Sequence, residues 1–392
     1  GMIARSIAGS LFVALLMLPT IASAGDKDPG WTSYIDALGI NGQIDELATP
    51  RNYTVGQVSS YDTSGGSADD MGAYEKRDNE IILAVLDGPG CITRFWVKNP
   101  VGFLRVYIDN LENPVLMAQL GDFFSGDMHV QSRRGDIWIE PLVGASGGGY
   151  YCYVPMPYKE KAAIVVESPD PSFTYQINYA TFPADTEIAS FSLTNNRADY
   201  EYFEDWKKEW NTANFQLTDK KTETYRHSRH QYYPDKNVLL YTNYGPGVIT
   251  ELEFMAESAS DEILANAWLQ VNVDGQKNPS ILCPLGALFG SPVLDGSNFT
   301  SLPVGRDGTR MWFRFPIPFR DSIEMRIING GTQILDMEYY IVTREGDIGD
   351  QLYFVARQES GATSAGQPFR AADIQGQGHF VGMSMGAAGG ES

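Results

Sequence analysis

Three stretches of this chain recur in the same order, at offsets of 157, 165 and 161 residues, and this duplication limits what the chain can fold into. The paired stretches are GPGCITRFWV (88–97) with GPGVITELEF (245–254), LRVYIDNLENPVLMAQLGDFFSG (104–126) with LQVNVDGQKNPSILCPLGALFGS (269–291), and YYCYVPMPYKEKAAIVVES (150–168) with RMWFRFPIPFRDSIEMRIING (310–330). Ordered repeats at a nearly constant offset indicate that one structural unit is present twice.

Each copy is built from short apolar runs such as IILAVL and CITRFWV, bounded by Gly, Pro, Asn and Asp. Runs of this length, rich in β-branched and aromatic residues, are typical of strands in an all-β protein. We therefore predict two tandem jelly-roll β-sandwiches joined by a short helical connector. The predicted ranges are 50–190 for the first jelly roll, 191–236 for the connector, 237–345 for the second jelly roll and 346–392 for a tail with one strand-like run and a Gly-rich end.

Helical periodicity is confined to residues 198–213 of the connector, where Tyr202, Trp206 and Trp210 follow one another at a spacing of four. A connector helix packed on a sheet accounts for this stripe of aromatic residues.

Residues 1–24 have the features of a secretory signal peptide: Arg5, a short apolar run, and Ala-Ser-Ala at 22–24. We expect the mature chain to be secreted or periplasmic, with no membrane insertion after cleavage. The formal net charge is -20. This charge repels phosphate backbones and anionic lipids, so nucleic acid is not an expected partner.

Three cysteines, Cys91, Cys152 and Cys283, leave an odd count. Three buried thiols are one interpretation, and a single disulfide between Cys91 and Cys152 in an exported protein is the other.

Five landmarks, in order, resemble glycoside hydrolase family 172, formerly catalogued as domain of unknown function 2961. They are SSYDTSGGSADD (59–70), GPGCITRFWV (88–97), LRVYIDNLENPVLMAQLGDFFSG (104–126), YVPMPYKEKAAIVVES (153–168) and GQGHFVG (376–382). The resemblance implies a double jelly roll that assembles as trimers or multiples of trimers and acts on α-linked furanosides, namely fructofuranosides and D-arabinofuranosides. It implies a carbohydrate partner, and we expect no cofactor.

The resemblance also implies a retaining mechanism with two glutamates, one in a Gly-Glu-Gly-Asp motif and one in a Thr-Gly-Thr-Glu-Asp-Tyr-Phe motif. Neither motif is present in this sequence. No catalytic residue is therefore carried over. The sequence leaves two alternatives: a shortened piece of a longer enzyme, or a non-catalytic double jelly roll that binds glycan or forms an oligomer.

Ser60, Tyr61 and Asp62 are the leading substrate-binding candidates, because they lie in a loop that the resemblance places near the sugar site. For Asp62, an Asx turn is the structural alternative.

Asp122 is a weak catalytic candidate, because Ala287 replaces it in the second copy. Trp96 and Trp138 are candidates for stacking on a sugar, and core packing is the alternative for each. His379 is a candidate through the resemblance alone.

Two other patterns favour structural roles. Asp109 and Asp274 open turns, where an aspartate most often caps its own turn. His227 and His230 have the spacing H-x-x-H, but no further ligand has the spacing of a metal site. We expect a solvated basic patch in the connector and no metal.

Overall fold

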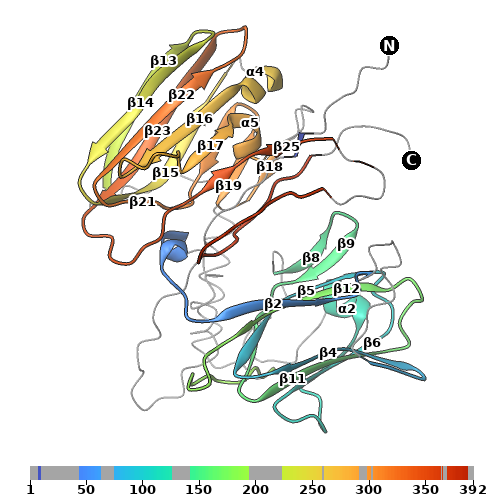
Figure 1. Ribbon diagram of the computed structural model, residues 1–392. Coiled ribbons are helices and arrows are strands. Elements are labelled where there is room, and N and C mark those ends of the chain that lie inside the picture. Colours follow the sequence, from blue (N-terminus) through green and yellow to red (C-terminus); the bar gives the residue numbers. More distant parts are fainter. Residues whose placement is uncertain are drawn as a thin grey trace, which may run out of the picture. The chain divides into compact units, whose positions relative to one another are not determined.

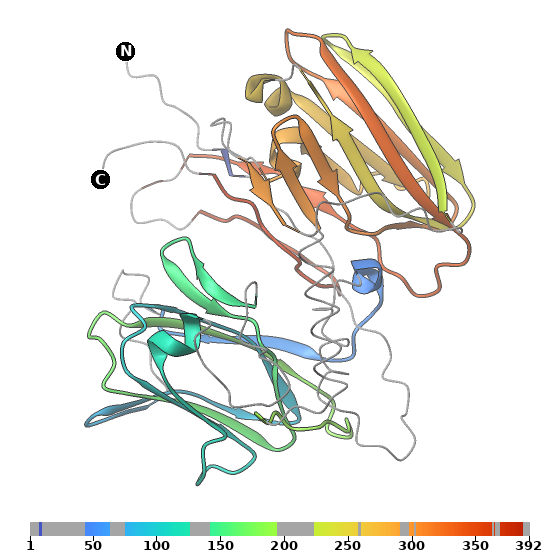
Figure 2. The same cartoon turned by 180° about the vertical axis from the view of Figure 1, so that it is seen from behind.

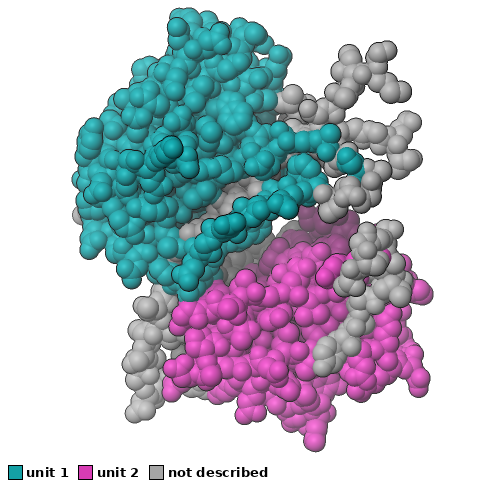
Figure 3. All heavy atoms as spheres, viewed as in Figure 1, with its two compact units in different colours: residues 1–19, 42–51, 212–392 teal, residues 20–41, 52–211 magenta. Residues whose placement is uncertain are grey.

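The computed structural model describes residues 8–9, 44–62, 75–125, 142–193, 223–257, 260–290, 298–301, 303–362, 364 and 369–386. These residues form two compact units (Figure 3). One unit contains residues 52–211, and the other contains residues 42–51 and 212–392. We refer to them as the first and second sandwich.

The first sandwich consists of two antiparallel sheets (Figure 1). The first sheet has the order β2-β12-β5-β9-β8, with β10 also paired to β5. The second sheet has the order β3-β4-β11-β6-β7, and helix α2 follows β7. The bounds are β2 Thr54–Ser59, β3 Glu75–Arg77, β4 Glu80–Asp87, β5 Gly90–Lys98, β6 Phe103–Ile108, β7 Leu116–Gln119, α2 Leu120–Ser125, β8 Val143–Ser146, β9 Gly149–Cys152, β10 Met156–Tyr158, β11 Lys161–Glu167 and β12 Thr174–Thr181.

The second sandwich repeats this plan. Its first sheet has the order β13-β23-β15-β20-β19-β18, with β21 paired to β15, and its second has the order β14-β22-β16-β17-β24. The bounds are β13 Glu223–Tyr232, β14 Lys236–Tyr244, β15 Gly247–Met255, α4 Asp261–Asn266, β16 Ala267–Val273, β17 Ile281–Pro284, α5 Leu285–Leu288, β18 Phe299–Thr300, β19 Val304–Asp307, β20 Arg310–Phe313, β21 Ile317–Phe319, β22 Ser322–Asn329, β23 Leu335–Glu345 and β24 Ala356–Arg357.

The strand order confirms the all-β double jelly roll. When the eight shared strands of either sandwich are numbered along the chain, the two sheets read 1-8-3-6 and 2-7-4-5, the jelly-roll arrangement. Figure 2 shows the same two pairs of sheets from behind. Inward-facing residues alternate along strands such as β6 and β22, and each sandwich has its own apolar core.

The duplication extends to backbone irregularities. Two residues of the first sandwich, Leu83 and Thr93, are skipped by the strand register. Their counterparts 157 residues later, Leu240 and Thr250, are skipped in the same way. A β-bulge of this kind bends a strand and fixes its register. The Ile-Thr of each repeated GPG-x-IT phrase therefore marks a bulge as well as a strand.

Asp109 and Asp274 also have equivalent roles, which differ from the predicted ones. Each lies in the left-handed region, at φ 59° and 51°. The Asp109 carboxylate accepts hydrogen bonds from the backbone N–H groups of Glu160 and Lys161, across the sandwich corner. Asp274 accepts from the N–H groups of residues 320–322 and from the Tyr353 hydroxyl. Both aspartates cap a neighbouring corner instead of their own turn.

The predicted connector ends earlier than expected. Residues 223–232 form β13, which pairs along its whole length with β23. Its polar sequence is that of a strand at the sheet edge with exposed side chains. His227 and His230 therefore lie on a strand, and their H-x-x-H spacing does not describe a helix face. The predicted helix at 198–213 lies outside the described residues.

Two short segments near the N-terminus contact residues of the second sandwich. The 3-10 helix η1 (Ile44–Ala48) packs Leu47 into the core of the second sandwich. Residues Ala8–Gly9 (β1) of the predicted signal peptide pair with β25 (Glu359–Ser360). Within the described part of the chain, no helix has the length and apolar character required to cross a membrane.

All three cysteines are buried free thiols, so the interpretation as small apolar core residues is confirmed and the Cys91–Cys152 disulfide is not formed. Cys152 lies opposite Phe95 in the sheet, four residues along β5 from Cys91. Burial raises the pKa of Cys152 and of Cys283 to about 12.

Candidate functional site

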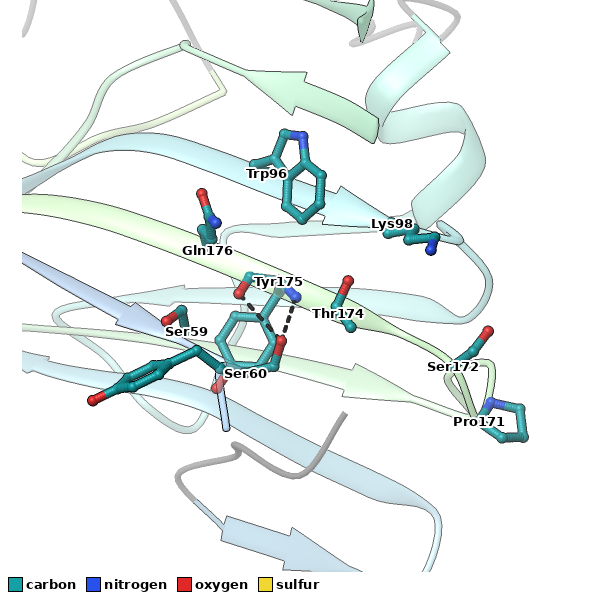
Figure 4. Close-up of a pocket in the computed structure, with 10 residues that line it drawn as sticks. Ser59, Ser60, Trp96, Lys98, Pro171, Ser172, Thr174, Tyr175 and Gln176 are labelled. Carbon is teal, nitrogen blue, oxygen red and sulfur yellow. Dashed lines mark hydrogen bonds between the residues drawn. The ribbon is translucent and has the colours of Figure 1, made fainter. Parts of the chain in front are cut away.

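A hollow of about 560 Å³ lies on the outer face of the first sheet of the first sandwich. Its lining comes from β5, from the end of β2 and the two residues after it, from the start of β12 and from the loop that enters β12 (Figure 4). The lining residues are Ser59, Ser60, Tyr61, Trp96, Lys98, Pro171, Ser172, Thr174, Tyr175 and Gln176. Three of the predicted candidates, Ser60, Tyr61 and Trp96, are thus brought together.

The strand register places the outward side chains in rows. Trp96 of β5 lies opposite Gln176 of β12, which lies opposite Ser59 of β2. In the next row, Lys98 lies opposite Thr174. Neighbouring strands are about 4.8 Å apart, so each row places an aromatic or charged group beside hydrogen-bonding groups.

The indole ring of Trp96 lies against the sheet over Gly149 of the neighbouring strand β9. A β-carbon built on Gly149 would lie only 2.3 Å from three atoms of that ring. Glycine therefore allows the ring to lie on the backbone of β9. Trp96 is half-buried and lines the hollow, so one side of the ring packs on the protein, and the stacking of a sugar on the other side stays a prediction.

Two polar side chains at the hollow have fixed orientations. The Gln176 Oε1 atom accepts a hydrogen bond from Arg94 Nη1 at 2.9 Å, which leaves the Gln176 amide N–H groups as donors for a ligand. Ser172 Oγ donates to Asp170 Oδ1 at 2.5 Å and accepts from Asn99 Nδ2 at 2.6 Å. The hydrogen bonds from the Ser172 side chain and backbone lower the pKa of Asp170.

The three loop candidates have different roles. Ser60 is only 3% exposed, and its Oγ accepts from the backbone N–H of Tyr175 at 2.9 Å, continuing the β2–β12 ladder. Tyr61 is 62% exposed at the rim. Asp62 follows Tyr61 and is not among the lining residues of the hollow. Ser60 thus holds the wall in place, and Tyr61 is the member of the trio available for contact.

The remaining candidates lie elsewhere. Asp122 is exposed on α2 and does not line the hollow. His379 belongs to the second sandwich, where burial and, secondarily, Arg51 lower its pKa to about 3. Trp138 lies outside the described residues. In the described ranges, no group of three or more His, Cys, Asp or Glu side chains forms a metal site.

The sequence prediction missed Arg94, Lys98, Ser172, Thr174 and Gln176. The signal for two of them was available: Arg94, Trp96 and Lys98 alternate along one predicted strand, so they share a face. The contributions of Ser172 and Gln176 depend on pairing between strands about 80 residues apart, which the sequence alone does not show.

The chemistry of the hollow favours binding. An aromatic platform and hydrogen-bonding side chains are what a sugar requires, since its ring carries apolar C–H faces and hydroxyl edges. Glycoside hydrolysis requires two carboxyl groups. None of the described lining residues is Asp or Glu.

Comparison with solved structures gives only distant similarities. The major capsid protein P2 from bacteriophage PM2 is 7% identical, with 80% of this chain and 99% of that chain covered, and a TM-score of 0.22. A structure of the infectious bursal disease virus Gt strain is 11% identical, with 80% and 86% covered and a TM-score of 0.18. With TM-scores this low, neither similarity supports an inference. No curated protein matches the chain.

Family models give the decisive comparison. The GH172 first beta-sandwich domain matches residues 51–199, and the GH172 domain-like model matches residues 222–342. The two matches follow the two sandwiches in order and together cover more than half of the chain. The resemblance expected from the five landmarks is confirmed, and this chain belongs to the GH172 family of glycoside-hydrolase-like, carbohydrate-active proteins.

Proposed function

We propose that this protein is exported and acts on glycans that contain α-linked furanosides, with the sugar held in the hollow of the first sandwich. The observation that carries the proposal is the Trp96 indole lying over Gly149, beside outward-facing polar side chains. Family membership supports the carbohydrate, and the predicted signal peptide supports export.

In this proposal, the sugar places a C–H face on Trp96. Its hydroxyl groups accept hydrogen bonds from the Gln176 amide, and they donate to or accept from the hydroxyls of Ser59 in the same row and Thr174 in the next row. Arg94 positions Gln176, and Asp170 positions Ser172, so the binding groups are largely preorganised.

Isothermal titration calorimetry with oligosaccharides of α-linked arabinofuranose and of fructofuranose tests the proposal. We expect Trp96→Ala to weaken binding at least tenfold, because it removes the platform. Tyr244→Ala is the matched control, since Tyr244 is 80% exposed on the second sandwich. Equal affinities of Trp96→Ala and the wild type would contradict the proposal.

Hydrolysis with retention is the second candidate, and family membership favours it. Its two carboxyl groups would lie about 5–5.5 Å apart. The described lining contains none, so we assign binding to the hollow and any cleavage to acids outside it. Turnover of p-nitrophenyl α-D-arabinofuranoside and of difructose anhydrides by the purified protein tests this candidate. A correctly folded protein that turns over neither would be assigned to glycan binding alone.

We also propose that the protein assembles into trimers or multiples of trimers, and this proposal rests on the family resemblance. Sedimentation velocity of the purified protein tests it directly. A single species with the mass of a monomer at micromolar concentration would contradict it.

A further inference from the structure

The hollow has a charge balance that is unusual for this protein. Although the chain has a net charge of -20, the charged side chains that the described strands place on this face near Trp96 are Arg94 and Lys98, two residues to either side of it on β5. Trp96 is therefore flanked by two cations on one strand face.

Neither cation is neutralised by a described residue. Arg94 donates to the amide oxygens of Gln176 and Asn178, at 2.9 and 3.1 Å, and both acceptors are uncharged. Lys98 is exposed and makes no ion pair with any residue that the structure describes. Asp170, the nearest carboxylate along the β12 entry loop, accepts from Ser172 and lines a separate hollow beyond Pro171.

The corresponding face of the second sandwich shows the opposite pattern. The strand register makes Glu251, Glu253 and Met255 the counterparts of Arg94, Trp96 and Lys98. Glu251 and Glu253 each bind an arginine at 2.7 Å, Arg314 and Arg310 respectively. The two arginines of the second face are thus paired with carboxylates, whereas Lys98 of the first face lines the hollow without a carboxylate partner among the described residues.

We propose that the hollow binds an anionic saccharide, one that carries a carboxylate or a sulfate group, with a sugar ring on Trp96 and the anion on Lys98. This inference rests on the proposed glycan-binding function and specifies its ligand. Residues two apart on a strand face are about 7 Å apart, so the anion belongs to the stacked ring or to the next ring. Cations that have no carboxylate partner among the described residues attract such a ligand and orient it.

The test compares three oligosaccharides of equal length: a neutral one, one with a uronic acid and one with a sulfate ester. Calorimetry at low and at high salt measures the affinity of each. We expect the wild type to bind at least one anionic ligand about tenfold more tightly than the neutral one, with an advantage that shrinks as salt rises. The carboxylate and sulfate ligands distinguish the two sources of negative charge.

Lys98→Met introduces the residue that the second sandwich has at this position. We expect it to remove the preference for the anion, so that the anionic ligands lose about tenfold in affinity and the neutral ligand loses much less. Lys98→Arg should keep the preference, and Lys236→Met is the control for loss of an exposed lysine elsewhere.

Equal wild-type affinities for the neutral and both anionic ligands would overturn the inference. So would a Lys98→Met variant that weakens neutral and anionic ligands equally. Failure of the proposed function itself looks different: Trp96→Ala would then leave the binding of every ligand unchanged.

Discussion

The outer faces of the two sandwiches have the same backbone arrangement but different side chains. Both faces follow the same strand order, and their sheets have bulges at equivalent positions, Thr93 and Thr250. The first face has the Trp96 ring between two cations that have no carboxylate partner among the residues that the structure describes. On the second face, Glu251 and Glu253 form ion pairs with Arg314 and Arg310. The comparison shows that the duplicated scaffold fixes where side chains point, and the substitutions on it decide whether the charged side chains of a face are paired with one another.

The second face has its charges arranged across strands. His227 stacks on Tyr340, with ring centroids 4.4 Å apart and planes 6° apart, and contacts Glu338. Arg229 binds Asp336 at 2.8 Å. These contacts occupy the positions that correspond to the walls of the hollow in the first sandwich.

The largest loss of stability is expected from breaking the ion pair between Glu251 and Arg314, whose side chains are 12% and 10% exposed. Burial raises the pKa of Glu251, and the attraction of Arg314 offsets only part of this effect. Glu251→Leu leaves the arginine buried without its partner, and we expect a loss of about 3–5 kcal/mol in the free energy of unfolding of the second sandwich. Urea denaturation measures it.

The double variant Glu251→Leu/Arg314→Met should recover most of this loss, because no unpaired charge remains. The counterpart in the first sandwich, Arg94→Met, should cost about 0.5–1.5 kcal/mol, since it removes hydrogen bonds to partly exposed amides. Equal costs for Glu251→Leu and Arg94→Met would show that the two faces do not differ as described.

A smaller loss of stability is expected from substitution of the corner aspartate Asp274. Burial alone would raise the pKa of Asp274, but the hydrogen bonds from Tyr353 and from the N–H groups of residues 320–322 outweigh burial and lower it. Asp274→Ala should cost about 1–3 kcal/mol at neutral pH.

The pH dependence of that cost has a definite sign. A carboxylate whose folded-state pKa is lowered contributes stability above its unfolded pKa, about 3.9, and loses it as the pH falls through the folded value. The stability difference between wild type and Asp274→Ala should therefore be constant from pH 5 to 7 and shrink below about pH 4. A difference that grows on acidification would contradict this role of Asp274.

The two jelly rolls were predictable from the sequence, and the pairing of the charged side chains on their faces was not. The repeated phrases and the short apolar runs sufficed to predict two jelly rolls, because alternation and turn residues are local signals. The edge strand β13 was missed because its exposed His, Arg and Ser residues hide the apolar alternation. The pairing of Glu251 with Arg314 joins residues 63 apart, and only the strand register reveals it.

The same limit applies to the hollow. Trp96 and Tyr61 were recognisable as aromatic side chains beside turns and loops. The reason that Trp96 lies flat is Gly149, 53 residues away, and the Gln176 side chain is oriented by Arg94, which donates a hydrogen bond to its Oε1 atom.

A modest change in the free energy of unfolding is expected from substitutions at two equivalent core positions, Tyr158 and Phe319. The hydroxyl of Tyr158 is buried with no hydrogen-bond partner among the described residues, and the strand register makes Phe319 its counterpart in the second sandwich. Tyr158→Phe should raise the free energy of unfolding by about 1 kcal/mol, because it removes an unsatisfied polar group. Phe319→Tyr should lower it by about 1–3 kcal/mol. Thermal and urea unfolding measure both, and a destabilised Tyr158→Phe would refute the equivalence.

The smallest effect is expected from reduction of the protein. Because Cys91, Cys152 and Cys283 are buried free thiols, dithiothreitol should leave the melting temperature unchanged. Ellman's reagent should react with the three thiols only after unfolding. A lowered melting temperature in reductant would indicate a disulfide that the structure does not contain.

The central claim is that the first face binds sugar through Trp96 and the second face does not bind sugar. The indole N–H resonances of Trp96 and Trp312 report on the two faces separately, after assignment with Trp96→Phe and Trp312→Phe variants. On titration of ¹⁵N-labelled protein with an anionic oligosaccharide, we predict that the Trp96 resonance shifts in a saturable manner and the Trp312 resonance stays in place. A saturable shift of Trp312 with an unmoved Trp96 would contradict the account.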